Sequence, residues 1–445
     1  MAPVASTVQE RTGHRVVWNQ SSAADAEADR AVADLLARPL TADAVAQVAL
    51  LNNRSLRATY EDVGVAQADL VRAGLLRNPI FEAQIRFAEG GGGTNVELAV
   101  AQEFLGILAI PLKQKVAAAN LAAAQQRVTG EVLATVAETK AAYYEAVAAR
   151  QAVETRKVIA EATAASALLS RRLNEAGNIS DLDRFQEQAL AEQAKLELAR
   201  AEVAEVEARE KLNRLLGVFG ERTAWTTADR LPDPPADDVP AAGLESLAVT
   251  NRADLLAARA AVDAAAASAA VPLPLLWWED GGELGASAER DAEGGWVVGP
   301  AVAIPIPIFD TGQATVSARR AEYRAARDRH AALAVQVRSE VRLARAKLAE
   351  ARARAAFMKD VLLPLRARVL EQTQLTYNAM HTGLSQLLLA KQEQVRAGME
   401  YVEALRDYWA ARAELERAVG GKLPGGAPAP ATQPAATEPA HVHPG

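Results

Sequence analysis

The feature that most constrains this chain is the run Gln313–Thr382, which contains no glycine and a single proline, Pro364. The run is rich in Ala, Leu, Arg, Glu and Gln, which are strong helix formers. As one helix it would reach about 100 Å, whereas a compact domain of this chain's length would be roughly 45 Å across. A matching run, Lys113–Asn174, lies in the first half of the chain. The sequence therefore predicts an elongated, duplicated architecture built on long helices.

Composition narrows the class of protein. Of the 445 residues, 50% are hydrophobic but only 4% are aromatic, so we expect thin walls of Ala-rich helices rather than a thick core. The net charge of −7 argues against nucleic-acid binding. The lack of cysteine excludes disulfides, thiolate metal sites, a Cys nucleophile and a lipidated N-terminal Cys.

The sequence also bears on targeting. No apolar run is long enough for a membrane-spanning helix, and Met1–Glu10 is too polar for a signal peptide. We therefore expect either a cytosolic chain or a targeting segment that is missing from this sequence.

The same order of elements is predicted twice. Each half contains a helix, two strands, a long helix, a tight turn and a returning helix. In residues 41–217 the strands are expected at about 79–88 and 95–104 and the last two helices at 113–174 and 182–216. In residues 244–420 the strands are expected at about 275–290 and 296–306 and the last two helices at 313–381 and 386–419. The second long helix should kink at Pro364.

Three other segments complete the chain. Residues 1–40 are expected to form an irregular strap with one helix at Ala23–Ala37. Residues 218–243 are expected to form an equatorial connector, and residues 421–445 a disordered tail.

Short sequence matches support the duplication. Three pairs of segments match between the halves: Ile179–Leu182 with Leu384–Leu387, Asn53-Arg54 with Asn251-Arg252, and Ile110–Leu112 with Ile306–Ile308.

The strands alternate with a period of two, so each has an apolar and a polar face. Apolar side chains predicted to face lipid are Phe81, Ile85, Phe87, Val96, Leu98, Val100, Trp296 and Val298. Polar side chains predicted to line an aqueous lumen are Glu82, Gln84, Arg86, Glu97 and Glu103. Trp277, Trp278 and Trp296 would suit an aromatic girdle, although Trp277 and Trp278 are adjacent and point opposite ways.

Four strands cannot close into a barrel, because about eight are the practical minimum. An open sheet would leave two edges and an apolar surface uncovered. One alternative is a soluble sheet whose apolar face packs under the helices. The other, which the strand length of roughly 9–11 residues favours, is a homo-oligomer that pools strands into one barrel in a membrane.

The duplicated plan resembles the TolC-type outer-membrane efflux factors. The residues that carry the resemblance are the strand-to-helix junctions IPLKQ and IPIPIFDTGQ and the turns EAGNISDLDRFQEQ and MHTGLSQLLLAKQE. The resemblance implies a mainly α protomer with a small transmembrane β part. Three such protomers share a twelve-stranded β-barrel and an α-barrel that forms a periplasmic tunnel. It also implies a passive exit channel in the outer membrane, which works with a periplasmic adaptor and an inner-membrane pump. Family members carry a signal peptide and often a lipidated Cys, and neither is present here.

The two helix breaks are the predicted functional sites. The resemblance implies that the tip turns dock the adaptor through Gly177, Asn178, Ile179, Thr382, Gly383 and Leu384. Candidates for a constriction at the tunnel mouth are Asp181, Asp183, Asn378 and His381. For Asp181 the competing interpretation is a helix cap, and for His381 it is a solvated surface residue.

No catalytic motif is present, so we expect no enzyme, cofactor or metal site. The segment Val63–Pro79 favours the family branch that serves metal-type pumps, but the cargo stays open between metal ions, drugs and small organic molecules. Alternative functions are a soluble elongated coiled-coil scaffold and a periplasmic adaptor.

Overall fold

The computed structural model describes residues 1–18, 22–87, 94–235, 239–240, 242–271, 282–290, 294–304, 306 and 308–423. The chain divides into two compact units, which are described separately. The strand unit comprises Met1–Ser6, Arg57–Glu131 and Thr250–Gln336. The hairpin unit comprises Thr7–Leu56, Val132–Val249 and Val337–Gly445. Both units draw on both halves of the chain, as a tandem duplication requires.

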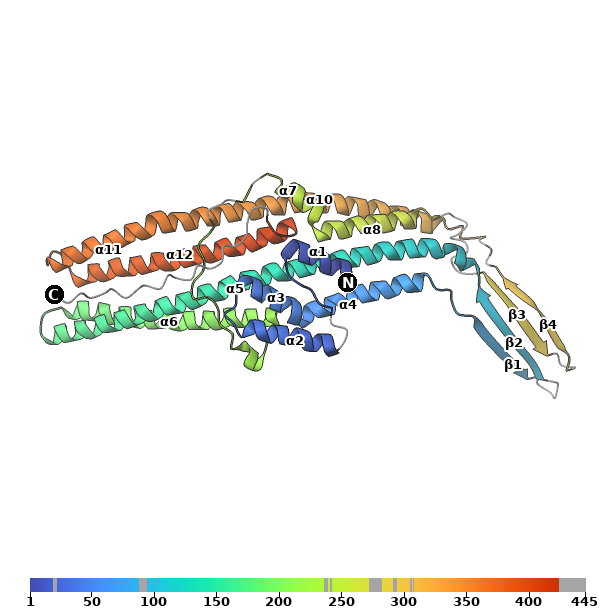
Figure 1. The fold of residues 1–445 in the computed structure, drawn as a ribbon, viewed down its shortest axis with the longest axis horizontal. Coiled ribbons are helices and arrows are strands. Elements are labelled where there is room, and N and C mark those ends of the chain that lie inside the picture. Colours follow the sequence, from blue (N-terminus) through green and yellow to red (C-terminus); the bar gives the residue numbers. More distant parts are fainter. Residues whose placement is uncertain are drawn as a thin grey trace, which may run out of the picture. The chain divides into compact units, whose positions relative to one another are not determined.

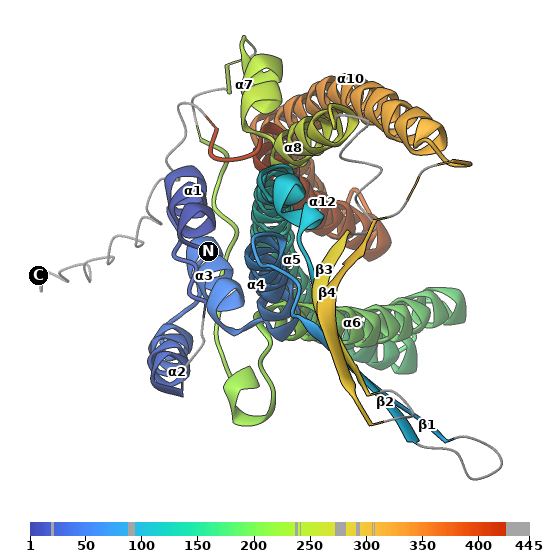
Figure 2. The ribbon, with the colours of Figure 1, turned by 90° about the vertical axis from the view of Figure 1, so that its right-hand side faces the viewer.

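The strand unit is a four-stranded antiparallel sheet joined to helices. Its strands are β1 (Ile80–Phe87), β2 (Thr94–Glu103), β3 (Glu283–Arg290) and β4 (Trp296–Ala303), and they lie side by side in chain order (Figures 1 and 2). Its helices are most of α4 (Arg54–Ala73), α8 (Ala253–Ala269), the 3-10 turn η1 (Leu105–Ala109) and the first parts of α5 (Ile110–Glu175) and α10 (Gln313–Phe357).

The central pairing of the sheet joins the two halves of the chain. Strand β2 pairs with β3, so that Glu97 lies opposite Glu289. Strand β2 contains 10 residues, within the expected 9–11, whereas β1, β3 and β4 contain 8 residues each and are slightly shorter. Of the expected strand 275–290, only 282–290 belong to the described residues, and Trp277 and Trp278 lie outside them.

The hairpin unit consists mainly of two long helical hairpins. The first pairs α5 with α6 (Asp181–Leu216), and the second pairs α10 and α11 (Leu363–Asn378) with α12 (Leu384–Val419). Shorter helices are α2 (Ser22–Leu36), α3 (Ala42–Asn52) and α7 (Leu244–Asn251), while α1 (Ala2–Thr12) is divided between the units. None of the helices within the described ranges combines the length and hydropathy that crossing a bilayer requires.

An aromatic cluster forms the core between the two hairpins of this unit. Tyr144 of α5 stacks on Trp409 of α12 with ring centroids 5.1 Å apart, and Tyr143 and Tyr408 pack edge-on against this pair. The Tyr143 hydroxyl donates to the Leu40 carbonyl at 2.9 Å, which satisfies a buried polar group. Four aromatic side chains therefore pack where helices from both halves of the chain meet.

The C-terminal end of α6 requires a glycine at position 217 and is bonded by the side chains of two asparagines, Asn52 and Asn53. Gly217 has a φ of 67°, and a Cβ there would come within 2.8 Å of the Asn52 carbonyl oxygen, so only glycine fits. The Asn52 side-chain amide donates to the Leu216 and Gly217 carbonyls, both at 2.8 Å. The Asn53 amide donates to the Leu215 carbonyl at 2.9 Å. The last carbonyls of α6 are thus satisfied by α3.

The structure corrects the prediction for residues 1–40, which are not largely irregular. The helix at Ser22–Leu36 is confirmed, but Ala2–Thr12 forms a helix that the sequence did not reveal. A helix this short is marginal alone and depends on packing. That packing is supplied by Val4 and Val8, which lie one turn apart and are fully buried.

Two predicted helices are interrupted. The helix expected at 244–270 breaks at Arg252, which has extended backbone angles. The helix expected at 313–381 changes to π-helix over Met358–Leu362 before α11 begins. Because Pro364 lacks an N–H, the ladder of i→i−4 bonds cannot continue through it, and the wider turn before it absorbs the mismatch. The tail from residue 424 onward lies outside the described residues.

Candidate functional site: the hairpin turns and the sheet faces

The first hairpin turn follows α5 with a regular helix-ending motif. Gly177 has a φ of 76°. Its N–H donates to the Asn174 carbonyl at 2.9 Å, while the Asn178 N–H donates to the Leu173 carbonyl at 2.8 Å. This pair of bonds is a Schellman motif, in which a left-handed residue closes the helix. Gly177 thus supplies the left-handed residue of the turn, and Asn178 and Ile179 complete the turn.

The start of α6 is capped by Ser180 rather than by Asp181. The Ser180 hydroxyl accepts from the Asp183 N–H at 3.2 Å, and the Asp183 carboxylate accepts from the Ser180 N–H at 3.4 Å and from its hydroxyl at 2.7 Å. These bonds form a capping box. Asp181 is exposed and faces Arg184 at 3.7 Å. Ser180 and Asp183 therefore cap the helix together, and Asp181 keeps a solvent-facing carboxylate.

The second hairpin turn has the same bonds but different residues. Met380 takes the left-handed position with a φ of 58°, and it is the only non-glycine residue with positive φ in the described chain. Its N–H donates to the Tyr377 carbonyl, and the His381 N–H donates to the Thr376 carbonyl, both at 2.9 Å. Gly383, the glycine of this turn, does not have left-handed backbone, because its φ is −83° at the N-cap of α12.

The two turns therefore align differently from the sequence match. Gly177 corresponds to Met380, and Ser180 corresponds to Gly383, since each pair holds the same position relative to its helices. The sequence match of Ile179 with Leu384 is therefore shifted by two residues from the structural alignment. Likewise, Asn53 corresponds to Arg252, not Asn251, because each ends one helix with extended backbone. The third match fails too, since Ile110 opens α5 whereas its match, Ile306, precedes α10.

Several large side chains at the turns are open to solvent. Met380 is 93% exposed, Leu182 is 65% exposed and Phe185 is 55% exposed. The guanidinium of Arg184 lies over the Phe185 ring at 4.0 Å. Asn378 and His381 are exposed in the second turn, and the Thr382 hydroxyl donates to the Gln386 side-chain oxygen. The two turns thus present exposed apolar groups beside charged ones.

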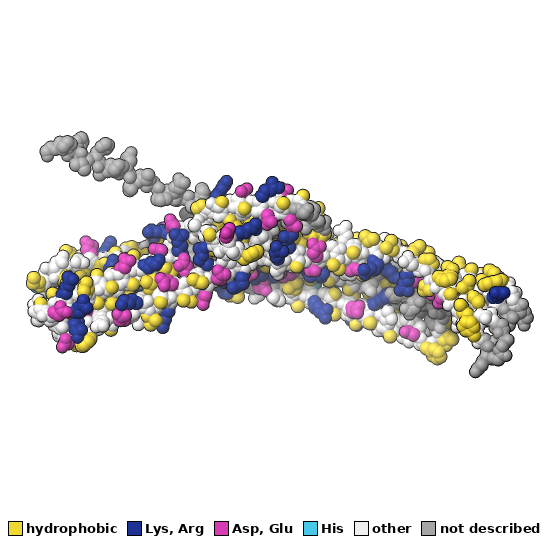
Figure 3. Space-filling view, turned by 90° about the horizontal axis from the view of Figure 1, so that it is seen from below, with side chains coloured by type: hydrophobic (Ala, Val, Ile, Leu, Met, Phe, Trp, Pro, Cys, Tyr) yellow, Lys and Arg dark blue, Asp and Glu magenta, His cyan; other side chains and the backbone are white. Residues whose placement is uncertain are grey.

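The strand pairing groups the predicted apolar side chains on one face. Phe81 lies opposite Val100, Ile85 opposite Val96, and Val298 opposite Ala288, which in turn lies opposite Leu98. Phe81, Ile85 and Phe87 are 66%, 56% and 80% exposed, and Val298 is 71% exposed. Figure 3 shows hydrophobic side chains gathered over the strands at the right-hand end of the view. The alternative of an apolar face packed beneath the chain's own helices is wrong.

The opposite face carries the polar groups of β1, β2 and β3. Arg86 pairs with Glu97 at 3.2 Å and donates to Gln84 at 2.7 Å, while the Asn95 amide donates to Glu289 at 2.7 Å. At the helix end of the sheet, Arg77 pairs with Glu103 at 3.1 Å. Glu283 and Glu289 also lie on this face, opposite Glu103 and Glu97, and were not among the predicted lumen residues although the expected strand 275–290 contains them. Strand β4 departs from the pattern, since Val297 takes a place on this face.

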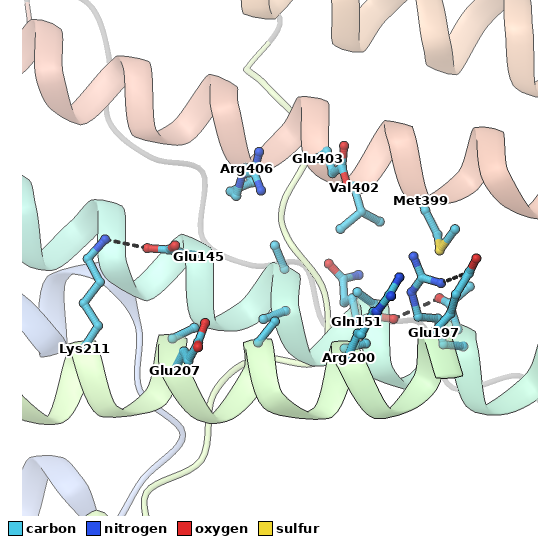
Figure 4. Close-up of a pocket in the computed structure, with 18 of the residues that line it drawn as sticks. Glu145, Gln151, Glu197, Arg200, Glu207, Lys211, Met399, Val402, Glu403 and Arg406 are labelled. Atoms are coloured by element: carbon cyan, nitrogen blue, oxygen red, sulfur yellow. Dashed lines mark hydrogen bonds and ion pairs between the residues drawn. The ribbon is translucent and has the colours of Figure 1, made fainter. Parts of the chain in front are cut away.

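A polar groove opens between the hairpins of the hairpin unit. It has a volume of about 710 Å³ and is lined by α5, α6 and α12 (Figure 4). Lys211 pairs with Glu145 at 2.7 Å across its floor, and Arg156 pairs with Glu197. Glu403 and Arg406 line the α12 side. Charges of both signs are mixed here, so the groove selects no single class of ligand.

A partly buried ionic cluster that the sequence did not reveal lies near the aromatic core. Lys140 pairs with Asp43 at 3.0 Å and with Glu416 at 3.9 Å, and Arg412 lies 3.6 Å from Glu416. Burial raises the pKa of Glu416. Burial opposes the ionised form of Asp43 as well, but Lys140 outweighs it and lowers the pKa of that carboxyl. These groups join α3, α5 and α12, which are distant in sequence.

His14 borders the same cluster. Its Nε2 atom lies 3.6 Å from the Asp43 carboxylate. Burial, reinforced by the nearby Lys140, lowers the pKa of His14 to about 4. Among the described residues no group of His, Asp and Glu side chains is arranged to hold a metal ion. His441 and His443 lie outside the described residues.

Comparison with known proteins finds similarity both in sequence and in fold. No protein-family model matches it. The cobalt-zinc-cadmium resistance protein CzcC of Cupriavidus metallidurans is 25% identical over 395 residues, which cover 86% of this chain and 91% of CzcC. The two solved structures described next are outer membrane channels rather than enzymes.

Solved structures share the fold over most of its length. The CmeC outer membrane channel of Campylobacter jejuni aligns with a TM-score of 0.72 at 15% identity, covering 86% of each chain. The open state of the MtrE outer membrane channel of Neisseria gonorrhoeae aligns with a TM-score of 0.69 at 18% identity, covering 85% of this chain and 88% of MtrE. The resemblance to TolC-type channels predicted from the junctions and turns is confirmed.

Proposed function

We propose that this chain, which has the fold of the TolC-type outer-membrane efflux channels, is the passive exit duct of a tripartite efflux system. Three copies form the channel in the outer membrane, and their helices extend into the periplasm. A periplasmic adaptor and an inner-membrane pump deliver the cargo and supply the energy.

The observation that carries this proposal is the uncovered sheet. Strands β1 and β4 each pair on one side only within the described chain, and the face bearing Phe81 and Val298 is exposed. Four strands are too few to close, and an open apolar sheet is a liability in water. Pooling the strands of three copies removes every edge and turns the apolar face toward lipid. The face bearing Glu82 and Glu97 then lines the water-filled lumen.

The helical hairpins supply the periplasmic part. Their turns, at Gly177 and Met380, form the end of the tunnel that meets the adaptor. Exposed Leu182, Phe185 and Met380 are the apolar contacts of that docking surface, because exposed apolar groups beside charges are typical of protein interfaces. Asp181, which is free of the helix cap, contributes a threefold ring of carboxylates at the tunnel mouth.

The cargo follows from the relationship to CzcC and from charge. The sequence similarity to a cobalt-zinc-cadmium resistance protein favours metal ions over organic solutes. Carboxylates on the polar face of three strands, at Glu82, Glu97, Glu103 and Glu289, would make such a lumen attractive to cations.

Conductance across a planar lipid bilayer tests this function. Purified protein should insert and give stepwise currents with a higher permeability for K⁺ than for Cl⁻. A protein that purifies from the soluble fraction and gives no current steps would support the coiled-coil scaffold instead.

A further inference from the structure

We propose that the second hairpin has a built-in hinge, formed by the π-helical segment Met358–Leu362 and Gly398, and that Asp233 of the connector latches it. The proposal rests on the function proposed above, because it assigns the residues that hold this hairpin in the position seen here. It concerns contacts within the hairpin unit alone.

The hinge consists of two weak points, one on each helix of the hairpin. On the outgoing side the π segment replaces the α-helical ladder, with the Leu363 N–H bonded to the Met358 carbonyl, and Pro364 follows. On the returning side α12 contains Gly398, and a Cβ there would meet nothing within 4 Å. Packing therefore does not require glycine, although glycine weakens a helix interior by about 1 kcal/mol.

The first hairpin has neither weak point. Within the hairpin unit, α5 is α-helical from Val132 to Glu175 without glycine or proline, and its one glycine, Gly130, belongs to the strand unit. Helix α6 contains no glycine or proline between Asp181 and Leu216. Both returning helices hold equivalent places in the duplication, so the difference is specific to the second hairpin. Bending should therefore be concentrated at Met358–Leu362 and Gly398.

Asp233 bridges both sides of the hinge. One carboxylate oxygen lies 2.6 Å from the Lys359 ammonium in the π segment. The other accepts a hydrogen bond of 2.8 Å from the Tyr401 hydroxyl, one turn from Gly398. The hydrogen bond from Lys359 lowers the pKa of Asp233, and Asp233 raises the pKa of Lys359, so both groups are charged at neutral pH.

The connector that carries Asp233 is itself anchored. The Trp409 indole donates to the Pro232 carbonyl at 2.8 Å, and the Arg352 guanidinium donates to the Pro235 carbonyl at 3.3 Å. The Leu231 N–H donates to the Gln151 side chain of α5 at 3.3 Å. Asp233 thus reaches the hinge from a backbone fixed on both hairpins, as a latch requires.

A small bend at this hinge has a large effect at the turn. Helix α11 spans Leu363–Asn378, so it is about 24 Å long. A rotation of about 5° at its start would move its end by roughly 2 Å. Releasing Asp233 therefore displaces the turn that carries Met380 more than any other part of this hairpin.

The test compares Asp233→Asn and Tyr401→Phe with a matched control, Asp229→Asn. Asp229 lies on the same connector but pairs with Arg150 of α5 at 3.2 Å, away from the hinge. Two readouts are used on detergent-solubilised full-length protein: amide hydrogen exchange over residues 358–365 and 396–402, and open probability in planar bilayers. The exchange readout does not depend on whether the protein conducts.

The latch predicts faster exchange at both segments and a roughly threefold to tenfold rise in the open fraction for Asp233→Asn and Tyr401→Phe. The swap Asp233→Lys with Lys359→Asp should bring both readouts back toward wild type, and Gly398→Ala should reduce the opening caused by Asp233→Asn. If amide hydrogens in these two segments exchange no faster in the Asp233→Asn variant than in the Asp229→Asn variant, the proposal that Asp233 is a latch is wrong. If no variant conducts while exchange responds as expected, the channel function fails and the latch stands.

Discussion

Gly177 and Met380 hold the same position in the two hairpin turns, and both have left-handed backbone, with φ of 76° and 58°. Each closes its helix with the same pair of backbone hydrogen bonds. Glycine adopts this conformation without strain, whereas an L-residue such as methionine pays about 1–2 kcal/mol. Met380 therefore has a strained backbone while its side chain is almost fully exposed. This combination fits a role in binding another protein rather than in packing within the chain.

Substituting these two residues should have opposite effects on stability. Gly177→Ala should speed hydrogen exchange at the end of α5, and Met380→Gly should slow it at the end of α11, each by about 1 kcal/mol of local opening free energy. Met380→Gly should nevertheless weaken adaptor binding, because it removes the exposed side chain. A Met380→Gly protein that binds the adaptor as tightly as wild type would contradict the docking role.

Substitutions of Asp181 and Asp183 in the first turn should have different effects, one on ion selectivity and the other on helix stability. Asp183→Ala should destabilise the start of α6 by about 1 kcal/mol, because it removes the carboxylate of the capping box. Asp181→Ala should leave that helix start unchanged and lower the cation-to-anion permeability ratio. Hydrogen exchange at residues 181–186 and reversal potentials measure the two effects. A shift of reversal potential for Asp183→Ala alone would reverse the assignment.

Acidification should destabilise the hairpin unit through His14. Its pKa is about 4 in the folded chain and 6.5 in its ordinary state, so between these values the unfolded chain binds a proton that the folded chain does not. The free energy of unfolding therefore falls as pH decreases through this window, by at most about 3 kcal/mol. The raised pKa of Glu416 acts in the opposite sense.

The variant His14→Gln isolates this contribution. Denaturation midpoints at pH 7 and pH 4.5 should differ less for His14→Gln than for wild type. Equal pH dependence in wild type and His14→Gln would show that His14 is not the proton-binding group.

The environment of the sheet faces can be measured directly, because the chain has no cysteine to remove. Spin labels attached to single cysteines introduced at Ile85 and Phe87 should relax faster in the presence of oxygen, which dissolves in lipid. Cysteines at the neighbouring positions Gln84 and Glu82 should respond to a water-soluble nickel reagent instead. Equal access of both reagents to both sets would contradict a lipid-facing and a lumen-facing side.

Much of this fold can be predicted from the periodicity of apolar residues and from the glycines and prolines that end helices and strands. The long helices and the alternation around Phe81 and Glu82 are local patterns, so the sequence alone placed them. What it could not place depends on long-range contacts. The aromatic core around Trp409, the Asp43–Lys140 pair and the Asp233 latch join residues more than 90 positions apart, and no local pattern marks them.

The two turns show why the finer alignment failed. The letters around Ile179 and Leu384 match, but the backbone aligns Gly177 with Met380, since the helix-ending bonds depend on position rather than on residue type. A methionine in left-handed backbone carries no sequence signal. The capping role of Ser180 with Asp183 was readable, because a serine three residues before an acidic residue is a known helix-start pattern.

The particle mass in detergent tests the central claim, that four strands per copy find closure only by joining those of other copies. Light scattering combined with absorbance and refractive index gives the protein mass without the detergent. Three chains of 47.1 kDa per particle is the predicted result, with the protein precipitating when detergent is withdrawn. A monodisperse single chain that stays in plain buffer would contradict the account.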